Sequence, residues 1–190
     1  MPHELYLLRH GETEWNREGR IQGSQDSPLT ARGREQATAQ ADILAREVPQ
    51  MWQLARYCSP LRRARDTARI ALDGLVPVID RRLREVDFGA WEGLTPAERG
   101  ARDPQLVAGC AGDLDLCRSA PGGEGLIGLE TRLRGFLADL RAPSIIVSHK
   151  IVLMVLRGVL TDRPAMEWDR IDVPQGVVFR IGNGRETVLH

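Results

Sequence analysis

Short apolar runs alternate along the chain with longer segments in which apolar residues recur every three or four positions. The short runs predict buried strands, at residues 5–8, 54–58, 76–79 and 144–147. The longer segments predict helices, at residues 30–46, 61–72 and 151–160, the first with Thr30 as its N-cap. Near the end, residues 177–181 and 186–189 flank Asn183-Gly184, which predicts a hairpin with a tight turn.

This order of elements predicts an α/β fold. We expect a three-layer sandwich: a mostly parallel central sheet with helices on both faces and an antiparallel edge strand from the hairpin. The 190 residues fit a single domain, 1–190. Within it, residues 93–122 contain several Gly and Pro and little periodicity. We therefore expect that segment to be a small lid insertion over the carboxyl ends of the strands.

The charge balance narrows the choice of partners. The 26 basic and 26 acidic side chains give a formal net charge of zero, whereas binders of nucleic acid or anionic membranes usually carry a basic excess. The longest strongly apolar stretch, residues 151–156, is far too short to span a bilayer. We therefore expect neither nucleic acid nor a membrane as a partner, and a homodimer stays possible.

The three cysteines point to a reducing compartment. Cys58, Cys110 and Cys117 are odd in number and lack the spacing of a zinc site, which predicts free thiols. Met1 leads almost directly into the first predicted strand, so no signal peptide is visible. We expect a cytoplasmic protein without a bound metal or cofactor.

Basic and histidine side chains follow three of the predicted strands. They are Arg9, His10 and Gly11 after the first strand, Arg62 and Arg63 after the second, and His149 after the fourth. Because the carboxyl ends of parallel strands meet at one edge of a sheet, we expect these residues in one cleft.

The residue types in this cleft suit a phosphate. The planar fork of arginine donates two parallel hydrogen bonds to phosphate oxygens. A neutral histidine can act as a nucleophile or a base. Gly11 would let the backbone approach an anion closely. A proton donor is still needed, and Glu85 is one candidate.

The order of these motifs resembles the histidine phosphatase superfamily, also called the phosphoglycerate mutase-like family. Five blocks carry the resemblance: Leu8-Arg9-His10-Gly11-Glu12-Thr13-Glu14-Trp15-Asn16 with Gly19 to Gly23, Ser59-Pro60-Leu61-Arg62-Arg63-Ala64, Glu85 with Gly89 and Trp91-Glu92-Gly93, Pro121-Gly122-Gly123-Glu124, and Val147-Ser148-His149. Together they span nearly the whole chain, so a chance match of all five in order is very improbable.

The resemblance implies a role for each motif residue. His10 is the nucleophile that becomes phosphorylated, and Glu85 protonates the leaving group and later activates water. Arg9, Arg63 and His149 hold the phosphoryl oxygens. Asn16 and Gln22 lie where the family has supporting contacts to phosphate or substrate. No metal and no cofactor is implied.

Each role sets a protonation state. His10 must be neutral to attack, which nearby arginines favour. His149 is expected to donate as a cation. Glu85 must be protonated, so its pKa should be raised, and Asp87 could contribute to that by like-charge repulsion.

The chain departs from the family pattern at two positions. Gly125 stands where a serine is common, so a helix cap or a substrate contact could be lost. Lys150, the only lysine, stands where a glycine is common. It would either add positive charge to the cleft or point away from it. Asp113 and Asp115 would oppose an anionic substrate if they face the cleft.

The expected activity is hydrolysis of a small-molecule phosphate monoester. A cofactor-dependent phosphoglycerate mutase is the alternative with the same core. The short segment between the third and fourth blocks favours the phosphatase, because its only basic residues are Arg99, Arg102 and Arg118. A non-catalytic phosphate-binding module is a third possibility.

Overall fold

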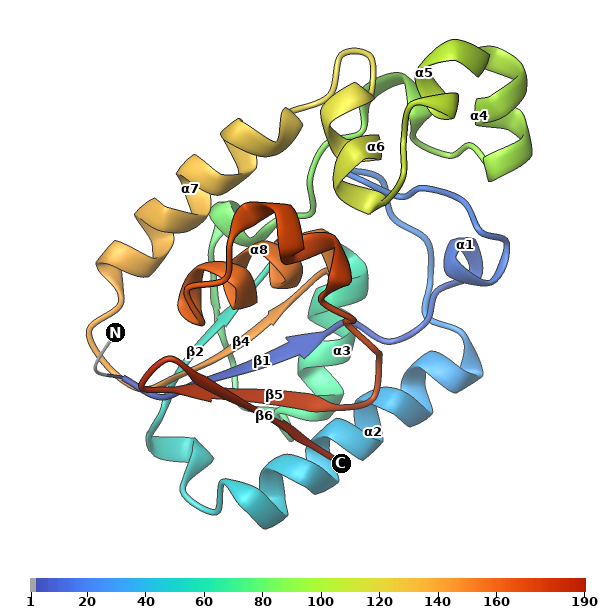
Figure 1. Cartoon of the computed structure of the whole chain (residues 1–190). Coiled ribbons are helices and arrows are strands. Elements are labelled where there is room, and N and C mark those ends of the chain that lie inside the picture. The colour runs from blue at the N-terminus through green and yellow to red at the C-terminus, as the bar shows by residue number, and fades with distance from the viewer. Residues whose placement is uncertain (1–2) are drawn as a thin grey trace.

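Six strands form one sheet in the order β3-β2-β4-β1-β5-β6 (Figure 1). The computed structural model describes residues 3–190; Met1, on which the argument about a signal peptide rests, lies outside the described residues. The strands are β1 (Leu5–Arg9), β2 (Ala55–Cys58), β3 (Val78–Ile79), β4 (Ser144–Ser148), β5 (Val178–Gly182) and β6 (Arg185–Leu189). β1 to β4 are parallel, and β5 pairs antiparallel with both β1 and β6. The expected mostly parallel sheet with an antiparallel edge is confirmed.

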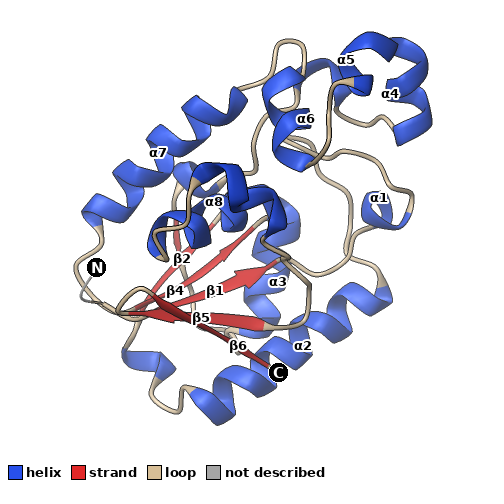
Figure 2. Cartoon of the chain, in the orientation of Figure 1, coloured by secondary structure: helices blue, strands red, loops and turns tan. Residues whose placement is uncertain are grey.

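Helices cover both faces of this sheet (Figure 2). Alternate residues of β1 enter different cores: Leu5 and Leu7 pack with α7 (Gly125–Asp139) and α8 (Lys150–Leu160), and Tyr6 and Leu8 pack with α2 (Ala31–Glu47) and α3 (Arg62–Ala71). A strand buried on both faces reads as a continuous apolar run, as the sequence has it. The three-layer arrangement follows directly.

The observed boundaries lie within a few residues of the expected ones. Thr30 is the N-cap of α2, where its side chain accepts from the Gly33 amide. The strand expected at 76–79 shrinks to Val78–Ile79, an exposed edge strand paired on one side only. Helix α7 was not predicted. Short helical pieces complete the chain: α1 (Glu14–Arg17), η1 (Met51–Gln53), η2 (Arg81–Leu83), η3 (Gly89–Trp91) and η4 (Ala165–Arg170).

Residues 93–122, here called the lid segment, are more regular than expected. They contain α4 (Pro96–Arg102), α5 (Pro104–Ala108) and α6 (Asp113–Ser119). Thr95 and Glu98 form a capping box that starts α4. The lid segment lies beyond the carboxyl ends of β1 and β4 in Figure 1.

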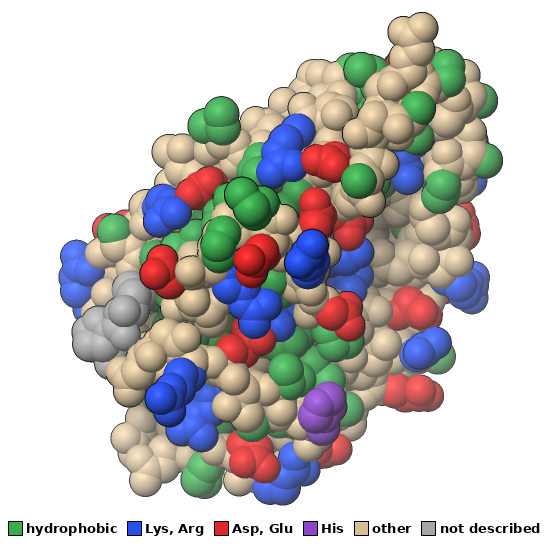
Figure 3. Space-filling model, in the orientation of Figure 1, with side chains coloured by type: hydrophobic (Ala, Val, Ile, Leu, Met, Phe, Trp, Pro, Cys, Tyr) green, Lys and Arg blue, Asp and Glu red, His purple; other side chains and the backbone are tan. Residues whose placement is uncertain are grey.

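Other surface features agree with the composition. Basic and acidic side chains are interspersed over the face seen in Figure 3. The three cysteines are free, as predicted, and their compartment stays a prediction. Within residues 3–190 no helix combines the length and apolar character that crossing a membrane requires.

Candidate functional site

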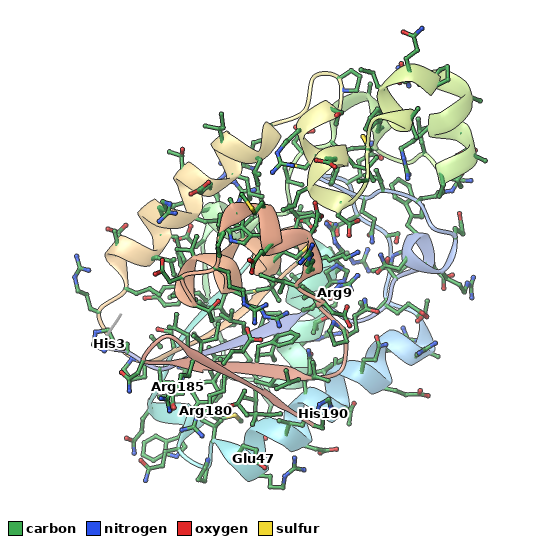
Figure 4. The ribbon with its side chains drawn as sticks, viewed as in Figure 1. His3, Arg9, Glu47, Arg180, Arg185 and His190 are labelled. Carbon is green, nitrogen blue, oxygen red and sulfur yellow. The ribbon has the colours of Figure 1, made fainter. Side chains whose placement is uncertain are left out.

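A cavity of about 240 Å³ lies at the carboxyl end of the sheet, between the strand ends and the lid segment. Figure 4 labels Arg9 at the carboxyl end of β1, with His3 at the opposite end of the strand. The lining side chains come from five parts of the chain; they include Arg9, His10, Asn16, Gln22, Arg63, Glu85, Arg99, Asp113, Lys150 and Ile151. The strand ends therefore converge as their order in the sequence predicts.

His10 is buried, and its Nδ1 lies 2.7 Å from the carbonyl oxygen of Gly11. A carbonyl oxygen only accepts, so Nδ1 carries the ring proton and Nε2 keeps its lone pair. Burial, followed by the charges of Arg63 and Arg9, holds the pKa of His10 well below its usual range. His10 is therefore a neutral imidazole with one free nitrogen in the cavity wall.

His149 packs beside His10, with ring centroids 5.1 Å apart. It is fully buried behind the cavity lining; its Nε2 lies 2.7 Å from Ser59 Oγ, and its Nδ1 has no partner. Burial and the charge of Arg63 hold the pKa of His149 well below its usual range. This shift favours a neutral His149 rather than the expected cation, because burial and nearby arginines both disfavour a second ring proton.

Arg63 is 1 % exposed and is fixed by the loop that follows α1. Its Nη1 donates to Asp26 Oδ1 (2.8 Å) and its Nη2 to the Gly23 carbonyl (2.8 Å). Arg9 is held by one bond, from Nη1 to the Val173 carbonyl (2.7 Å). The Nε atoms of both arginines are buried without a partner. Each guanidinium is therefore oriented by the protein but keeps unused donors.

Glu85 is buried beside the start of α8. Its two oxygens accept from the backbone N–H of Val86 (3.0 Å) and of Ile151 (3.3 Å). Burial raises the pKa of Glu85, although the two N–H bonds and Arg63 oppose that shift. The expected direction agrees, but Asp87 is not its cause: the Asp87 carboxylate accepts from the Gly89 amide instead.

Of the three remaining residues that we expected at the phosphate, two line the cavity and one does not. Asn16 and Gln22 line the cavity, where Gln22 Nε2 donates to Thr13 Oγ1 (2.8 Å) and Asn16 Oδ1 accepts from the Thr13 amide (3.2 Å). Gly11 does not line it: its amide donates to Thr67 Oγ1 (3.0 Å). A Cβ at Gly11 would lie 2.1 Å from the Gly33 carbonyl oxygen. Close packing against α2, rather than approach to an anion, explains this glycine.

The structure shows the surroundings of Lys150 and Gly125, the two residues that depart from the family pattern. Lys150 lines the cavity, and its Nζ lies 2.5 Å from Asp113 Oδ2, so both residues face inward and offset each other. Asp115 instead pairs with Arg118. At the start of α7, Gly125 adopts a positive φ and the N-cap Glu124 makes no side-chain cap.

Several site residues were not expected from the sequence. Arg99 and Phe88 line the cavity, and Gln175 donates from Nε2 to the His10 carbonyl. Gln175 follows no strand and belongs to no recognisable motif. Arg99 is one of three arginines in the lid segment, and the sequence does not distinguish it from the other two. Among residues 3–190, no three His, Cys, Asp or Glu side chains cluster closely enough to hold a metal ion.

The chain belongs to the histidine phosphatase superfamily: the model of its branch 1 matches residues 5–188. The chain is 38 % identical to "Probable phosphoglycerate mutase GpmB" of Enterobacter sp. (strain 638), with 94 % of this chain and 84 % of that protein covered. It is 36 % identical to glucosyl-3-phosphoglycerate phosphatase of Mycobacterium tuberculosis, with 86 % and 78 % covered.

Solved structures agree with this membership. A mycobacterial glucosyl-3-phosphoglycerate phosphatase in complex with VO3 superposes with a TM-score of 0.82 at 30 % identity, over 98 % of this chain and 96 % of that one. The alpha-ribazole phosphatase from Shigella flexneri superposes with a TM-score of 0.80 at 30 % identity, over 97 % and 94 %. Family and fold are thereby confirmed, and these relatives are consistent with phosphomonoesterase activity.

Proposed function

We propose that this chain hydrolyses small phosphomonoesters through a phosphohistidine formed on His10. One observation carries the proposal: three nitrogens, Arg9 Nε, Arg63 Nε and His149 Nδ1, are buried without partners. Arg9 and Arg63 line the same cavity as His10, and the His149 ring packs beside the His10 ring. Buried polar atoms in native proteins are nearly always paired. An anion with several acceptor oxygens would satisfy all three.

In the first step, the lone pair of His10 Nε2 attacks phosphorus. The N–P bond forms while the P–O bond to the alcohol breaks, and the carboxyl proton of Glu85 goes to the leaving oxygen. Arg9 and Arg63 neutralise the charge on the equatorial oxygens. His149 takes part as a neutral donor from Nδ1. This role requires the Ser59 hydroxyl, which accepts from the Leu61 amide, to donate its proton to His149 Nε2 at 2.7 Å.

In the second step, water attacks the phosphohistidine. The Glu85 carboxylate takes a proton from the water as the new O–P bond forms. The P–N bond breaks, its electron pair returns to His10 Nε2, and inorganic phosphate leaves. The enzyme thereby regains neutral His10 and protonated Glu85, so one carboxyl group serves both steps.

The lid segment supports hydrolysis over a mutase. A mutase must exclude water and hold both glycerate products, which requires additional cations around the cavity. Of the three arginines in the lid segment, only Arg99 lines the cavity. Arg102 and Arg118 pair with Asp103 and Asp115 on the surface. Because the Enterobacter relative is named a probable phosphoglycerate mutase, isomerisation of phosphoglycerate is the alternative to be tested.

Phosphate release from a panel of monoesters tests the proposal, with EDTA present and no added metal. We expect release by the wild type, because arginines supply the positive charge, and a loss of at least about 10³-fold in His10→Ala, which lacks the nucleophile. His3→Ala is the matched control, since His3 lies at the opposite end of β1 (Figure 4).

Two other results would contradict the proposal. Activity in His10→Ala equal to that of the wild type would exclude the phosphohistidine. Interconversion of 3- and 2-phosphoglycerate without phosphate release would assign the mutase.

A further inference from the structure

Arg99 is an unexplained buried cation in the lid segment. Its side chain comes from α4, is 7 % exposed and lines the same cavity as His10. Its Nη1 donates to the Leu94 carbonyl (3.1 Å), and its Nε is buried without a partner. Across residues 3–190, no carboxylate lies within 4.0 Å of its guanidinium. A buried charge without a counter-charge is costly, so a structural role alone does not account for it.

The other arginines of the lid segment provide the contrast. Arg102 pairs with Asp103 at 3.7 Å and Arg118 with Asp115 at 2.7 Å, and both are largely exposed. Arg20, which also lines the cavity, pairs with Glu18 and Glu98. Arg99 alone among these four points inward without an acidic partner.

The neighbouring charges define what Arg99 can bind. Lys150 lies in the same cavity, but Asp113 offsets it at 2.5 Å. Asp113 also acts on Arg99 from a distance, and burial nevertheless lowers the pKa of Arg99. One positive charge is therefore left uncompensated at the lid side of the cavity. The guanidinium fork suits the two oxygens of a carboxylate.

We propose that Arg99 binds a carboxylate of the substrate, so that the preferred substrates are small phosphomonoesters that also carry a carboxylate. The phosphoryl group lies at Arg9 and Arg63, and the carboxylate lies at Arg99. A second phosphate group, with up to two negative charges, would exceed the single charge that Arg99 supplies. This inference rests on the proposed hydrolase function and assigns its substrate class.

Two substrates with one carbon skeleton test it. In 3-phosphoglycerate a carboxylate replaces the terminal hydroxymethyl group of glycerol 3-phosphate. We expect wild-type kcat/KM to favour 3-phosphoglycerate by at least about tenfold, the effect of one charge-assisted hydrogen bond. In Arg99→Met, which keeps the apolar stem, we expect this ratio to fall by about 10- to 100-fold.

Two further variants sharpen the result. Arg102→Met removes an arginine from the same helix outside the cavity and should leave the ratio at its wild-type value. Asp113→Asn frees Lys150 and should raise the ratio by roughly 3- to 10-fold. Because Asp113 and Lys150 are both partly exposed, this second variant should fold, and it tests the charge at the lid side of the cavity even if Arg99→Met fails to fold.

The possible results distinguish a failure of the Arg99 inference from a failure of the proposed hydrolase function. Release that depends on His10 but has equal kcat/KM for both substrates overturns the role of Arg99 and leaves the hydrolase standing. An Arg99→Met ratio unchanged from wild type does the same. A larger Arg99→Met effect on propane-1,3-diol bisphosphate than on 3-phosphoglycerate overturns the carboxylate assignment. Release from neither substrate, nor from any other monoester, contradicts both proposals.

Discussion

His10 and Glu85 have pKa values that move toward each other because both are buried in one cavity. Burial lowers the pKa of His10 below its ordinary value of 6.5 and raises that of Glu85 above its ordinary value of 4.5. Attack requires neutral His10, so activity should be lost as the pH falls through the His10 pKa, below 6.5. Protonation of the leaving group requires the Glu85 carboxyl, so activity should also be lost as the pH rises through the Glu85 pKa, above 4.5.

A pH profile of kcat/KM for an alkyl phosphate tests Glu85. We expect Glu85→Gln to lose about 10²- to 10⁴-fold in rate, the contribution of one general acid. It should also lose the alkaline limb of the profile. Because the substrate titrates identically for both enzymes, the difference between the profiles belongs to the enzyme. p-Nitrophenyl phosphate should suffer less, because its phenolate leaves without a proton.

Asp87→Asn is the control for this experiment. Asp87 accepts from the Gly89 amide and does not set the pKa of Glu85, so the alkaline limb should stay in place. An alkaline limb that persists in Glu85→Gln would exclude Glu85 as the proton donor.

At the scale of elements, carboxylates from other parts of the chain cap three helices near the site. The N-cap residues of α3, α6 and α8 make no side-chain cap. Asp26 accepts from the first amides of α3, Asp169 from the Leu114 amide of α6, and Glu85 from the Ile151 amide of α8. Each bond satisfies a helix terminus. Asp26 and Glu85 join α3 and α8 to loops beside the cavity, whereas Asp169 joins α6 to η4 outside it. Helix starts and site geometry therefore depend on the same side chains.

The contact between α2 and the segment that follows β1 depends on two glycines, Gly33 and Gly11. A Cβ at Gly33 would lie 2.0 Å from the Glu12 carbonyl oxygen. Gly33→Ala should therefore destabilise by about 1–3 kcal/mol, as overpacking does, despite the better helix propensity of alanine. Gly135→Ala in α7 meets nothing within 4 Å and should instead stabilise by about 0.5–1 kcal/mol. Denaturant unfolding measures both, and a stabilised Gly33→Ala would contradict the clash.

The elements also show what the sequence could predict. Strand ends that carry His10, Arg63 and His149 are recognisable locally, and parallel pairing then brings them together. Helix α7 was missed although its buried Leu126, Leu129, Leu133 and Phe136 recur every three or four residues; the glycines at 125, 128 and 135 obscure that pattern. That Arg99 lacks an acidic partner could not be predicted, because this depends on which carboxylates the tertiary fold places near its guanidinium.

At the scale of the molecule, two polar ties join α6 of the lid segment to the rest of the described fold. The first, Lys150–Asp113, belongs to the cavity itself. The second lies outside the cavity, where Asp169 Oδ1 accepts from the Leu114 amide at 2.9 Å and the Asp169 carboxylate packs over Gly112. The cavity has residues of the lid segment as one wall and strand ends as the other. Its geometry therefore depends on how firmly these ties hold.

Removing the hydrogen bond between Asp169 and the Leu114 amide should make α6, which forms part of one cavity wall, more mobile without changing any residue that lines the cavity. We expect Asp169→Ala to lower the free energy of unfolding by about 1 kcal/mol, the usual effect of a lost cap. Hydrogen exchange at residues 114–119 should be faster by a factor of about five, while that of β1 and β4 is unchanged. KM should rise more than kcat falls, because Asp113 and Leu116 line the cavity but take no part in the chemistry. Asp169→Asn keeps the accepting oxygen and should behave as the wild type; equal effects of both variants would show that the hydrogen bond is not the tie.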